Sequence, residues 1–127
     1  MVSGPQPAAP RFAEDQVVTV FRSRRRPQAE PAYQSLSREM ESKARSMPGF
    51  VDFKSFTAVD GEQVSVVTFA TPADQRAWRD DLSHGAAQQR GRDEIYDEYS
   101  IQVARCTYVS DWSRPPERPR PIPGPPA

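Results

Sequence analysis

The order in which the hydrophobic pattern changes along the chain constrains its fold more than any other feature. Residues 16–23, QVVTVFRS, are β-branched and aromatic, which predicts a strand. Residues 50–59 and 63–71 are also apolar and flank Asp60-Gly61, a strong hairpin signal, so they should be antiparallel neighbours. Between the first and second strands, residues 31–47 carry apolar groups at helical spacing and stop at Pro48-Gly49. The apolar positions are Tyr33, Leu36, Met40, Ala44 and Met47.

A second helix and a last strand follow the hairpin. Thr71 precedes Pro72 and has Asp74 three residues later, which is typical of a capped helix start. This helix should end near Ser83. Its inward residues are expected to be Ala77, Trp78 and Leu82. Residues 84–97 are predicted to form a short polar helix weakened by Gly85 and Gly91, and residues 98–112 are predicted to form a long final strand.

The resulting β-α-β-β-α-β order predicts an α+β fold of the ferredoxin-like, split βαβ type, with helices on one face of an antiparallel sheet. Both faces of the strands are nevertheless apolar. Val64 and Val66 point one way and Val67 and Phe69 the other, while Phe53 is opposed to Phe50 and Phe56. No segment remains to cover the helix-free face. We therefore expect a homodimer packed sheet to sheet, with the last strand crossing onto the partner.

Composition limits the classes of partner and site. Seventeen basic and seventeen acidic residues give a formal net charge of zero, so no long-range electrostatic attraction to nucleic acid or to an anionic membrane is expected. One cysteine, Cys106, and one histidine, His84, leave no cluster spaced for zinc or iron. No apolar run is long enough to span a bilayer and no secretory signal is recognisable, so a cytoplasmic protein is expected.

Both ends of the chain are rich in proline. Residues 1–15 and 113–127 are predicted to be extended or disordered, which leaves residues 16–112 as one domain. The tail stretch PPERPRP contains a PxxP spacing, which binds aromatic grooves in other proteins. Because this pattern is short and proline-rich ends are common, a passive tail is the favoured interpretation.

Four segments within residues 16–112 have a recognisable pattern: VVTVFRSRR, MPGF, DGEQVSVVTFATPADQRAW and HGAAQQRGRDEIYDEYSIQVA. Together they resemble the antibiotic biosynthesis monooxygenase domain of the dimeric α/β-barrel superfamily. The resemblance implies a dimeric barrel and a largely apolar pocket between the sheet and the helices. It also implies a monooxygenase of secondary metabolism that acts on an aromatic or polyketide-derived substrate, with molecular oxygen as co-substrate and no cofactor.

Such a reaction needs a base, a dry pocket and donors that hold the substrate anion. His84 is the candidate base because its unperturbed pKa lies nearest neutrality. The alternative is a surface histidine that caps the loop after Ser83. Trp78 is expected in the core, where its ring could also contact substrate. Gln88 and Arg92 follow His84 at four-residue steps and could present donors, unless Arg92 pairs with Asp93 or Asp97.

Three further residues complete the predicted substrate site. Tyr96 is a candidate contact, although Tyr96 and Tyr99 also suit a core or a dimer interface. Phe21 and Arg22 at the end of the first strand are candidates as well. Arg22 could hold an acidic substrate group or lie in a solvated loop.

Other functions remain open at this stage. The same pocket could serve a non-oxidative polyketide cyclase or isomerase, or a module that binds a hydrophobic ligand without turnover. Haem-degrading relatives resemble the chain at Trp78, but their haem-ligating histidine falls near Gln88. Glutamine is a poor iron ligand, so haem is not expected.

Overall fold

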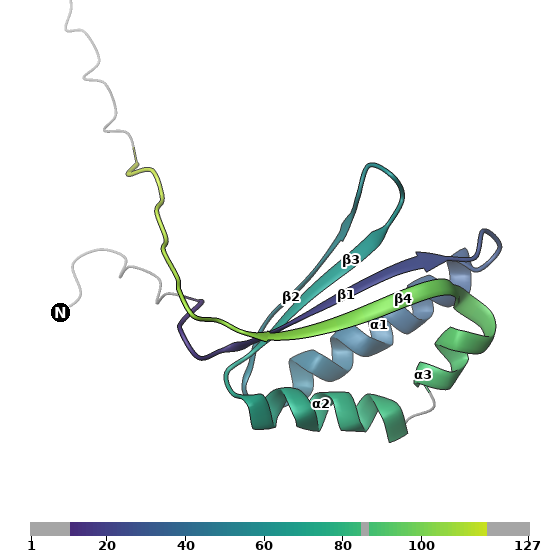
Figure 1. The fold of residues 1–127 in the computed structure, drawn as a ribbon, viewed down its shortest axis with the longest axis horizontal. Coiled ribbons are helices and arrows are strands. Elements are labelled where there is room, and N and C mark those ends of the chain that lie inside the picture. Colours follow the sequence, from purple (N-terminus) through teal and green to yellow (C-terminus); the bar gives the residue numbers. More distant parts are fainter. Residues whose placement is uncertain (1–10, 85–86, 117–127) are drawn as a thin grey trace, which may run out of the picture.

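The computed structural model describes residues 11–84 and 87–116. Its elements follow the predicted β-α-β-β-α-β order, with two short helical segments before the last strand (Figure 1). They are β1 (Val17–Arg25), α1 (Glu30–Ser46), β2 (Phe50–Thr57), β3 (Gln63–Phe69), α2 (Pro72–His84), α3 (Ala87–Arg90), the π-helix η1 (Gly91–Ile95) and β4 (Tyr96–Arg105).

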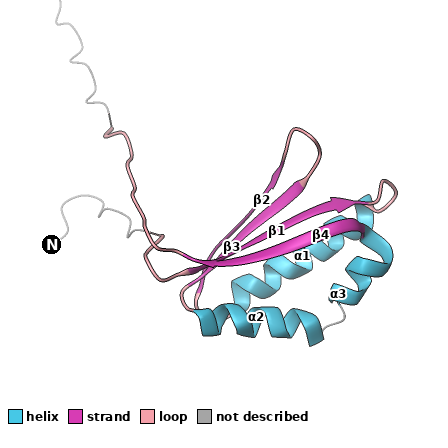
Figure 2. Cartoon of the chain, viewed as in Figure 1, coloured by secondary structure: helices cyan, strands magenta, loops and turns pink. Residues whose placement is uncertain are grey.

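The four strands form one antiparallel sheet in the order β2-β3-β1-β4. The first strand is therefore central and pairs with β3 on one side and β4 on the other. Figure 2 shows α1 and α2 on the same side of this sheet. The α+β ferredoxin-like fold predicted from the sequence is confirmed.

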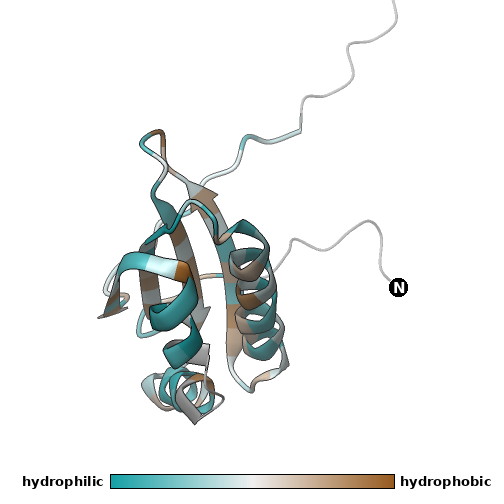
Figure 3. Ribbon diagram, turned by 90° about the vertical axis from the view of Figure 1, so that its right-hand side faces the viewer, coloured by the Kyte–Doolittle hydropathy of each residue, from teal (hydrophilic) through white to brown (hydrophobic). Residues whose placement is uncertain are grey.

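The core lies between the sheet and the helices and consists of two clusters. One contains Leu36 of α1 with Ile95 and Tyr96. The other contains Phe69 of β3 and Trp78 of α2, whose ring centroids are 5.5 Å apart. In Figure 3, α1 carries both hydrophobic and hydrophilic residues, as an amphipathic helix does when one side faces a core.

Two local signals fix where elements begin. The hydroxyl of Thr71 accepts a hydrogen bond from the backbone N–H of Asp74 at 3.1 Å, so the predicted cap of the second helix is confirmed. Gly49 joins α1 to β2 with φ +79°, and a Cβ there would lie 2.0 Å from the Asp74 carboxylate. Only glycine suits this turn, because both the backbone angle and the space exclude a side chain.

The start of β2 differs from the prediction. Strict alternation opposes Phe50 to Phe53, but the pairing register shifts between Phe50 and Asp52. The irregularity turns Phe50 to the helix side, where it packs with Phe69 at 6.1 Å between ring centroids. The expectation that Phe50 opposes Phe53 is therefore wrong.

The region after α2 also differs from the prediction. His84 is the last residue of α2 and Gly91–Ile95 form a π-helix, so residues 84–97 are not one short helix. The last strand runs from Tyr96 to Arg105 rather than over 98–112. Arg105 pairs with Val17, where β1 begins, and so the segment after Arg105 has no neighbouring strand to extend the ladder.

Ala77 is exposed, contrary to the expectation that it faces inward. The inward side of α2 instead carries Gln75, Trp78 and Leu82, at steps of three and four residues. Helical spacing therefore places Ala77 beside this stripe and not in it.

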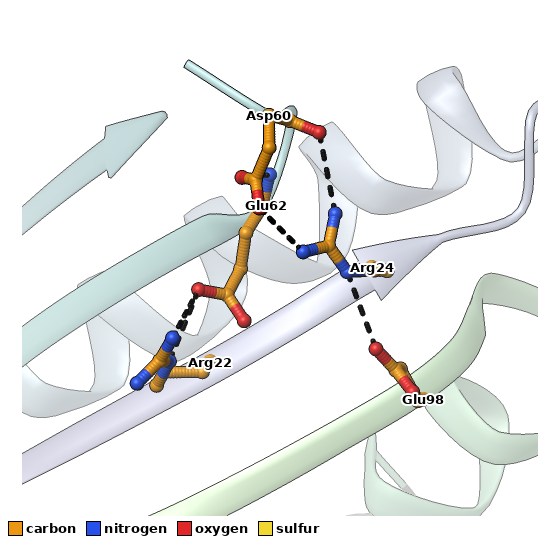
Figure 4. Close-up of polar contacts among 5 residues, drawn as sticks. All are labelled: Arg22, Arg24, Asp60, Glu62 and Glu98. Carbon is orange, nitrogen blue, oxygen red and sulfur yellow. Dashed lines mark hydrogen bonds and ion pairs between the residues drawn. The ribbon is translucent and has the colours of Figure 1, made fainter. Parts of the chain in front are cut away.

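The helix-free face of the sheet has an apolar centre and a charged band at one end. Val20 of β1 lies opposite Val66 of β3, and Val64 lies opposite Phe56, which is half exposed. The charged band consists of Arg22, Arg24, Asp60, Glu62 and Glu98 (Figure 4).

Within the charged band, Arg22 pairs with Glu62 at 2.7 Å. Arg24 pairs with Asp60 at 2.7 Å and with Glu98 at 3.2 Å. The hydrogen bond from Arg24 lowers the pKa of Asp60. These contacts tie the hairpin tip to β1 and β1 to β4.

Residues 1–10 and 117–127, which make up most of the two predicted tails, lie outside the described residues. Among the helices that are described, none has the length and apolar character needed to cross a membrane.

Candidate functional site

A cavity lies between the helix-covered face of the sheet and the helices. The space between the side chains is about 750 Å³ when the part that opens to solvent is counted, and the volume open to the centre of a water-sized sphere is about 90 Å³. Every strand, both long helices and η1 contribute to its wall. The strands supply Thr19, Phe21, Phe53, Ser65, Val67, Tyr96, Tyr99 and Ile101, and the helical segments supply Leu36, Met40, Gln75, Trp78, Arg79, Leu82 and Gly91.

Three rings form an aromatic cluster at one part of the wall: Phe21, Tyr96 and Tyr99. Their centroids are 5.5 to 5.7 Å apart, with Phe21 and Tyr96 edge to face. Gly91 lies directly behind Tyr96, and a Cβ at that position would come within 2.9 Å of the Tyr96 ring. The π-helix thus lets the backbone approach this ring closely.

A second part of the wall is polar and buried. Gln75, only 2% exposed, donates a hydrogen bond from Nε2 to the Thr19 hydroxyl at 3.1 Å. Ser65 shares a hydrogen bond of 2.7 Å with Ser55 on the neighbouring strand. These partners keep the polar groups satisfied without a ligand.

Two donors on the wall are different because they are buried without a hydrogen-bond partner among the described residues. They are the Tyr96 hydroxyl and the Trp78 indole N–H. Burial raises the pKa of Tyr96 well above its usual value, so its phenol stays protonated near neutral pH. Buried donors normally have partners, and these two have none among the described residues.

The structure brings together three of the predicted substrate residues. Phe21, Trp78 and Tyr96 all line the cavity. Arg92 is exposed and does not line it, but its Nε donates to the Tyr99 hydroxyl at 2.7 Å. Arg22 lies on the helix-free face in the charged band, since it alternates with Phe21 along β1, and it does not reach the cavity.

The positions of His84 and Gln88 are known only as parts of helices. His84 ends α2 and Gln88 lies in α3. Their side chains lie outside the described residues, and so their predicted roles stay predictions.

Sequence reasoning missed the polar part of the wall. Gln75 stands three residues before Trp78 on α2, and Thr19 stands two residues before Phe21 on β1. Residues three apart in a helix, and residues two apart in a strand, lie on the same side of their element. The positions of Trp78 and Phe21 would therefore have identified Gln75 and Thr19 as wall residues. Within the part of the chain that is described, no group of three or more His, Cys, Asp or Glu side chains could hold a metal ion.

Comparison with known proteins supports the fold assignment. No protein family model matches the sequence. The uncharacterized protein YqjZ of Bacillus subtilis is 30% identical over 73 residues, which cover 58% of this chain and 64% of YqjZ, less than two thirds of that relative's length.

Solved structures are similar over most of the chain. A protein from Nitrosomonas europaea described as a "putative antibiotic biosynthesis monooxygenase" has a TM-score of 0.65 at 15% identity and covers 79% of this chain and 98% of its own. Rv0793 from Mycobacterium tuberculosis has a TM-score of 0.64 at 17% identity, and the match covers 77% of this chain and 99% of Rv0793.

SnoaB, a cofactor-independent oxygenase from Streptomyces nogalater, has a TM-score of 0.57 at 16% identity, covering 80% of this chain and 99% of SnoaB. At these identities the likeness establishes the fold. It agrees with the sequence resemblance to the antibiotic biosynthesis monooxygenase domain.

The unpartnered hydroxyl of Tyr96 predicts an unusual effect on stability. We expect Tyr96→Phe to leave the free energy of unfolding unchanged or raise it by up to about 1 kcal/mol, because it removes a buried group without a partner. Tyr33→Phe is the matched control. It removes a hydroxyl that donates to Gln63 at 3.2 Å and should cost about 1 kcal/mol. Urea denaturation measures both, and a larger loss for Tyr96→Phe than for Tyr33→Phe would contradict this view of the site.

Proposed function

We propose that the chain is a monooxygenase that uses molecular oxygen without a metal or organic cofactor. Its substrate is a small aromatic or polyketide-derived molecule of secondary metabolism. The observation that carries the proposal is the cavity with its aromatic cluster and its two unpartnered donors, Tyr96 and Trp78. It is supported by the fold shared with SnoaB, which is described as a cofactor-independent oxygenase.

The chemistry suits a substrate that can reduce oxygen by itself once it is ionised. A substrate CH₂ group next to an enolisable aromatic ketone loses a proton, and the carbanion equivalent then reacts with O₂. One oxygen atom becomes the new carbonyl, and the other leaves as water with the two hydrogens of the CH₂ group. No external reductant is needed. The protein has to hold the anion, which donors in a dry pocket do well.

We assign the donor role to Tyr96 and Trp78, because an anionic oxygen would give both buried groups an acceptor, which neither has among the described residues. His84 is proposed as the base that removes the substrate proton, since α2 carries it six residues after Trp78. Gln88 is proposed to assist as a further donor. Phe21, a member of the aromatic cluster, would pack against the ring of the substrate.

Oxygen uptake tests the proposal directly. With anthrone as a tricyclic enolisable probe and EDTA present, we expect uptake of one O₂ per anthrone above the uncatalysed rate. His84→Ala should lower kcat by about 100-fold, the usual contribution of a positioned base. Tyr96→Phe and Trp78→Phe should each lower kcat/KM by about tenfold or more. Arg38→Gln, on an exposed position of α1 outside the cavity wall, is the control and should change neither value.

Two results would contradict the oxygenase proposal. If anthrone is converted without oxygen uptake, the pocket performs non-oxidative chemistry. If the probe binds but is not converted, and His84→Ala leaves its affinity intact, the chain is a ligand-binding module.

We also propose that the chain is a homodimer through the helix-free sheet face. The centre of that face is apolar, from Val18 and Val20 of β1 to Val64 and Val66 of β3, and the charged band forms one rim. An apolar centre with a polar rim is typical of a protein interface. The segment after β4 carries Tyr108 and Trp112, each about three quarters exposed at 75% and 74%, which would pack on the partner subunit.

Light scattering after size-exclusion chromatography tests the dimer. The native chain should have the mass of a dimer at micromolar concentration, and Val66→Asp should have the mass of a monomer because it places a charge in the apolar centre. The control is Val103→Asp on β4, since Val103 is 44% exposed on the helix-covered face. A native chain that is monomeric, or a Val66→Asp variant that stays folded and dimeric, would rule out this interface.

A further inference from the structure

The cavity lies between the two clusters of the hydrophobic core and takes wall residues from both. Leu36 and Tyr96 belong to one cluster, and Val67 and Trp78 belong to the other. A ligand that fills the cavity therefore contacts both clusters, and each cluster limits the size of that ligand. At Tyr96 the limit depends on the residue at position 91, which also belongs to the wall.

The backbone of η1 does not require glycine at position 91. Among the described residues, positive φ angles occur at Asp15, Gly49 and Gly61 but not at Gly91. Alanine adopts the negative φ angle of this position without strain. Glycine in a helical segment is also less favourable than alanine, because it loses more backbone entropy on folding. The glycine at position 91 therefore has a reason other than local backbone geometry.

That reason is the ring of Tyr96. A Cβ at position 91 would lie 2.9 Å from Cε2 and 3.1 Å from Cδ2 of Tyr96, and 3.7 Å from Cδ2 of Leu36. Non-bonded carbon atoms pack best at about 3.5 to 4.0 Å, so the Leu36 contact is ordinary and the two contacts with the ring are too close. An alanine at position 91 would therefore displace the Tyr96 ring.

Neighbouring rings restrict where the Tyr96 ring can move. Its centroid is 5.5 Å from that of Phe21, 5.7 Å from that of Tyr99 and 6.4 Å from that of Tyr33. The empty space beside the Tyr96 ring is the cavity that it lines. A methyl group at position 91 would thus reduce the cavity, because it moves the ring or fills part of the wall itself.

Tyr96 carries a second unfavourable feature at the same place. Its hydroxyl is buried without a hydrogen-bond partner among the described residues, a cost that phenylalanine would avoid. A glycine in a helical segment and an unpartnered phenol both lower stability. Such local costs are expected where residues serve a ligand rather than the fold. The two features together therefore point to a role of the contact between Gly91 and Tyr96 in ligand binding.

We infer that Gly91 determines the size of ligand that the cavity accepts. By leaving room for the Tyr96 ring, it opens the cavity to a fused-ring aromatic ligand of two or more rings, and a methyl group at this position would restrict the cavity to a single ring. Gly91 is a positioning residue, because it acts through Tyr96. The inference rests on the cavity used in the proposed function, but it concerns binding and not turnover.

Calorimetric titration with benzoate and 2-naphthoate tests the inference, because the two probes carry the same carboxylate and differ by one fused ring. The native protein should bind 2-naphthoate about tenfold more tightly, since the second ring buries more apolar surface. Gly91→Ala should lower the affinity for 2-naphthoate by about tenfold and leave the affinity for benzoate unchanged. Asp93→Ala, at an exposed position of the same π-helix, is the matched control and should change neither affinity.

A second substitution separates the effect on the cavity from a general effect on folding. Tyr96→Val removes both ring atoms that face position 91, so Gly91→Ala should no longer lower the affinity for 2-naphthoate in this background. If Gly91→Ala alone does not fold, Tyr96→Val should restore both folding and 2-naphthoate binding to the double variant.

Equal affinities of the native protein for the two probes would overturn the inference. So would a Gly91→Ala variant without a selective loss of 2-naphthoate affinity, or a loss that persists in the Tyr96→Val background. Ring-selective binding without oxygen uptake on anthrone would leave the inference standing and remove the oxygenase proposal. Oxygen uptake on anthrone together with equal affinities for the two probes would do the reverse.

Discussion

The pairing of β1 with two antiparallel neighbours is the constraint on which the rest of the structure depends. Because β1 lies between β3 and β4, the alternation of its side chains decides which residues face the helices and which face away. Thr19 and Phe21 enter the cavity wall, whereas Val20 and Arg22 lie on the open face. A shift of one residue in this register would exchange the pocket wall for the proposed dimer surface.

This register also connects the two faces functionally. The charged band ties the hairpin tip and β4 to β1 on one face, through Arg24 and its two carboxylate partners. On the other face, β4 supplies Tyr99 and Ile101 to the cavity wall. The same strands that would meet a second subunit thus hold the residues that meet a ligand. If two sheets pack back to back, the second subunit would hold the strands of the pocket wall in place without occupying the cavity itself.

Much of the fold could be predicted from the sequence, because its strongest signals are local. The Asp60-Gly61 turn, the Thr71 cap and the helical spacing around Leu36 each correspond to an element of the structure. Part of the site follows from the same patterns, since Trp78 lies on the inward side of an amphipathic helix. Arg22 could also have been assigned from the sequence: it is adjacent to Phe21 in a strand, and adjacent residues in a strand face opposite sides.

The remaining features depend on contacts that are distant in sequence. The register shift that turns Phe50 inward depends on the Gly49 turn and on pairing with β3, and the end of β4 depends on where β1 begins. The hydrogen bond from Arg92 to Tyr99 joins a π-helix to an edge strand. The spacing of apolar residues in the sequence does not predict a π-helix. That Tyr96 and Trp78 have no hydrogen-bond partner among the described residues depends on packing alone.

The central claim is that a ligand binds in the cavity beneath the sheet and gives the Trp78 indole N–H an acceptor. Proton–nitrogen correlation spectra measure this directly, because the chain has two tryptophans and Trp112 lies outside the cavity wall. On titration with 2-naphthoate, the account predicts a saturable shift of the Trp78 indole resonance while the Trp112 resonance stays in place. A Trp78 resonance that does not move while the probe binds would contradict the account.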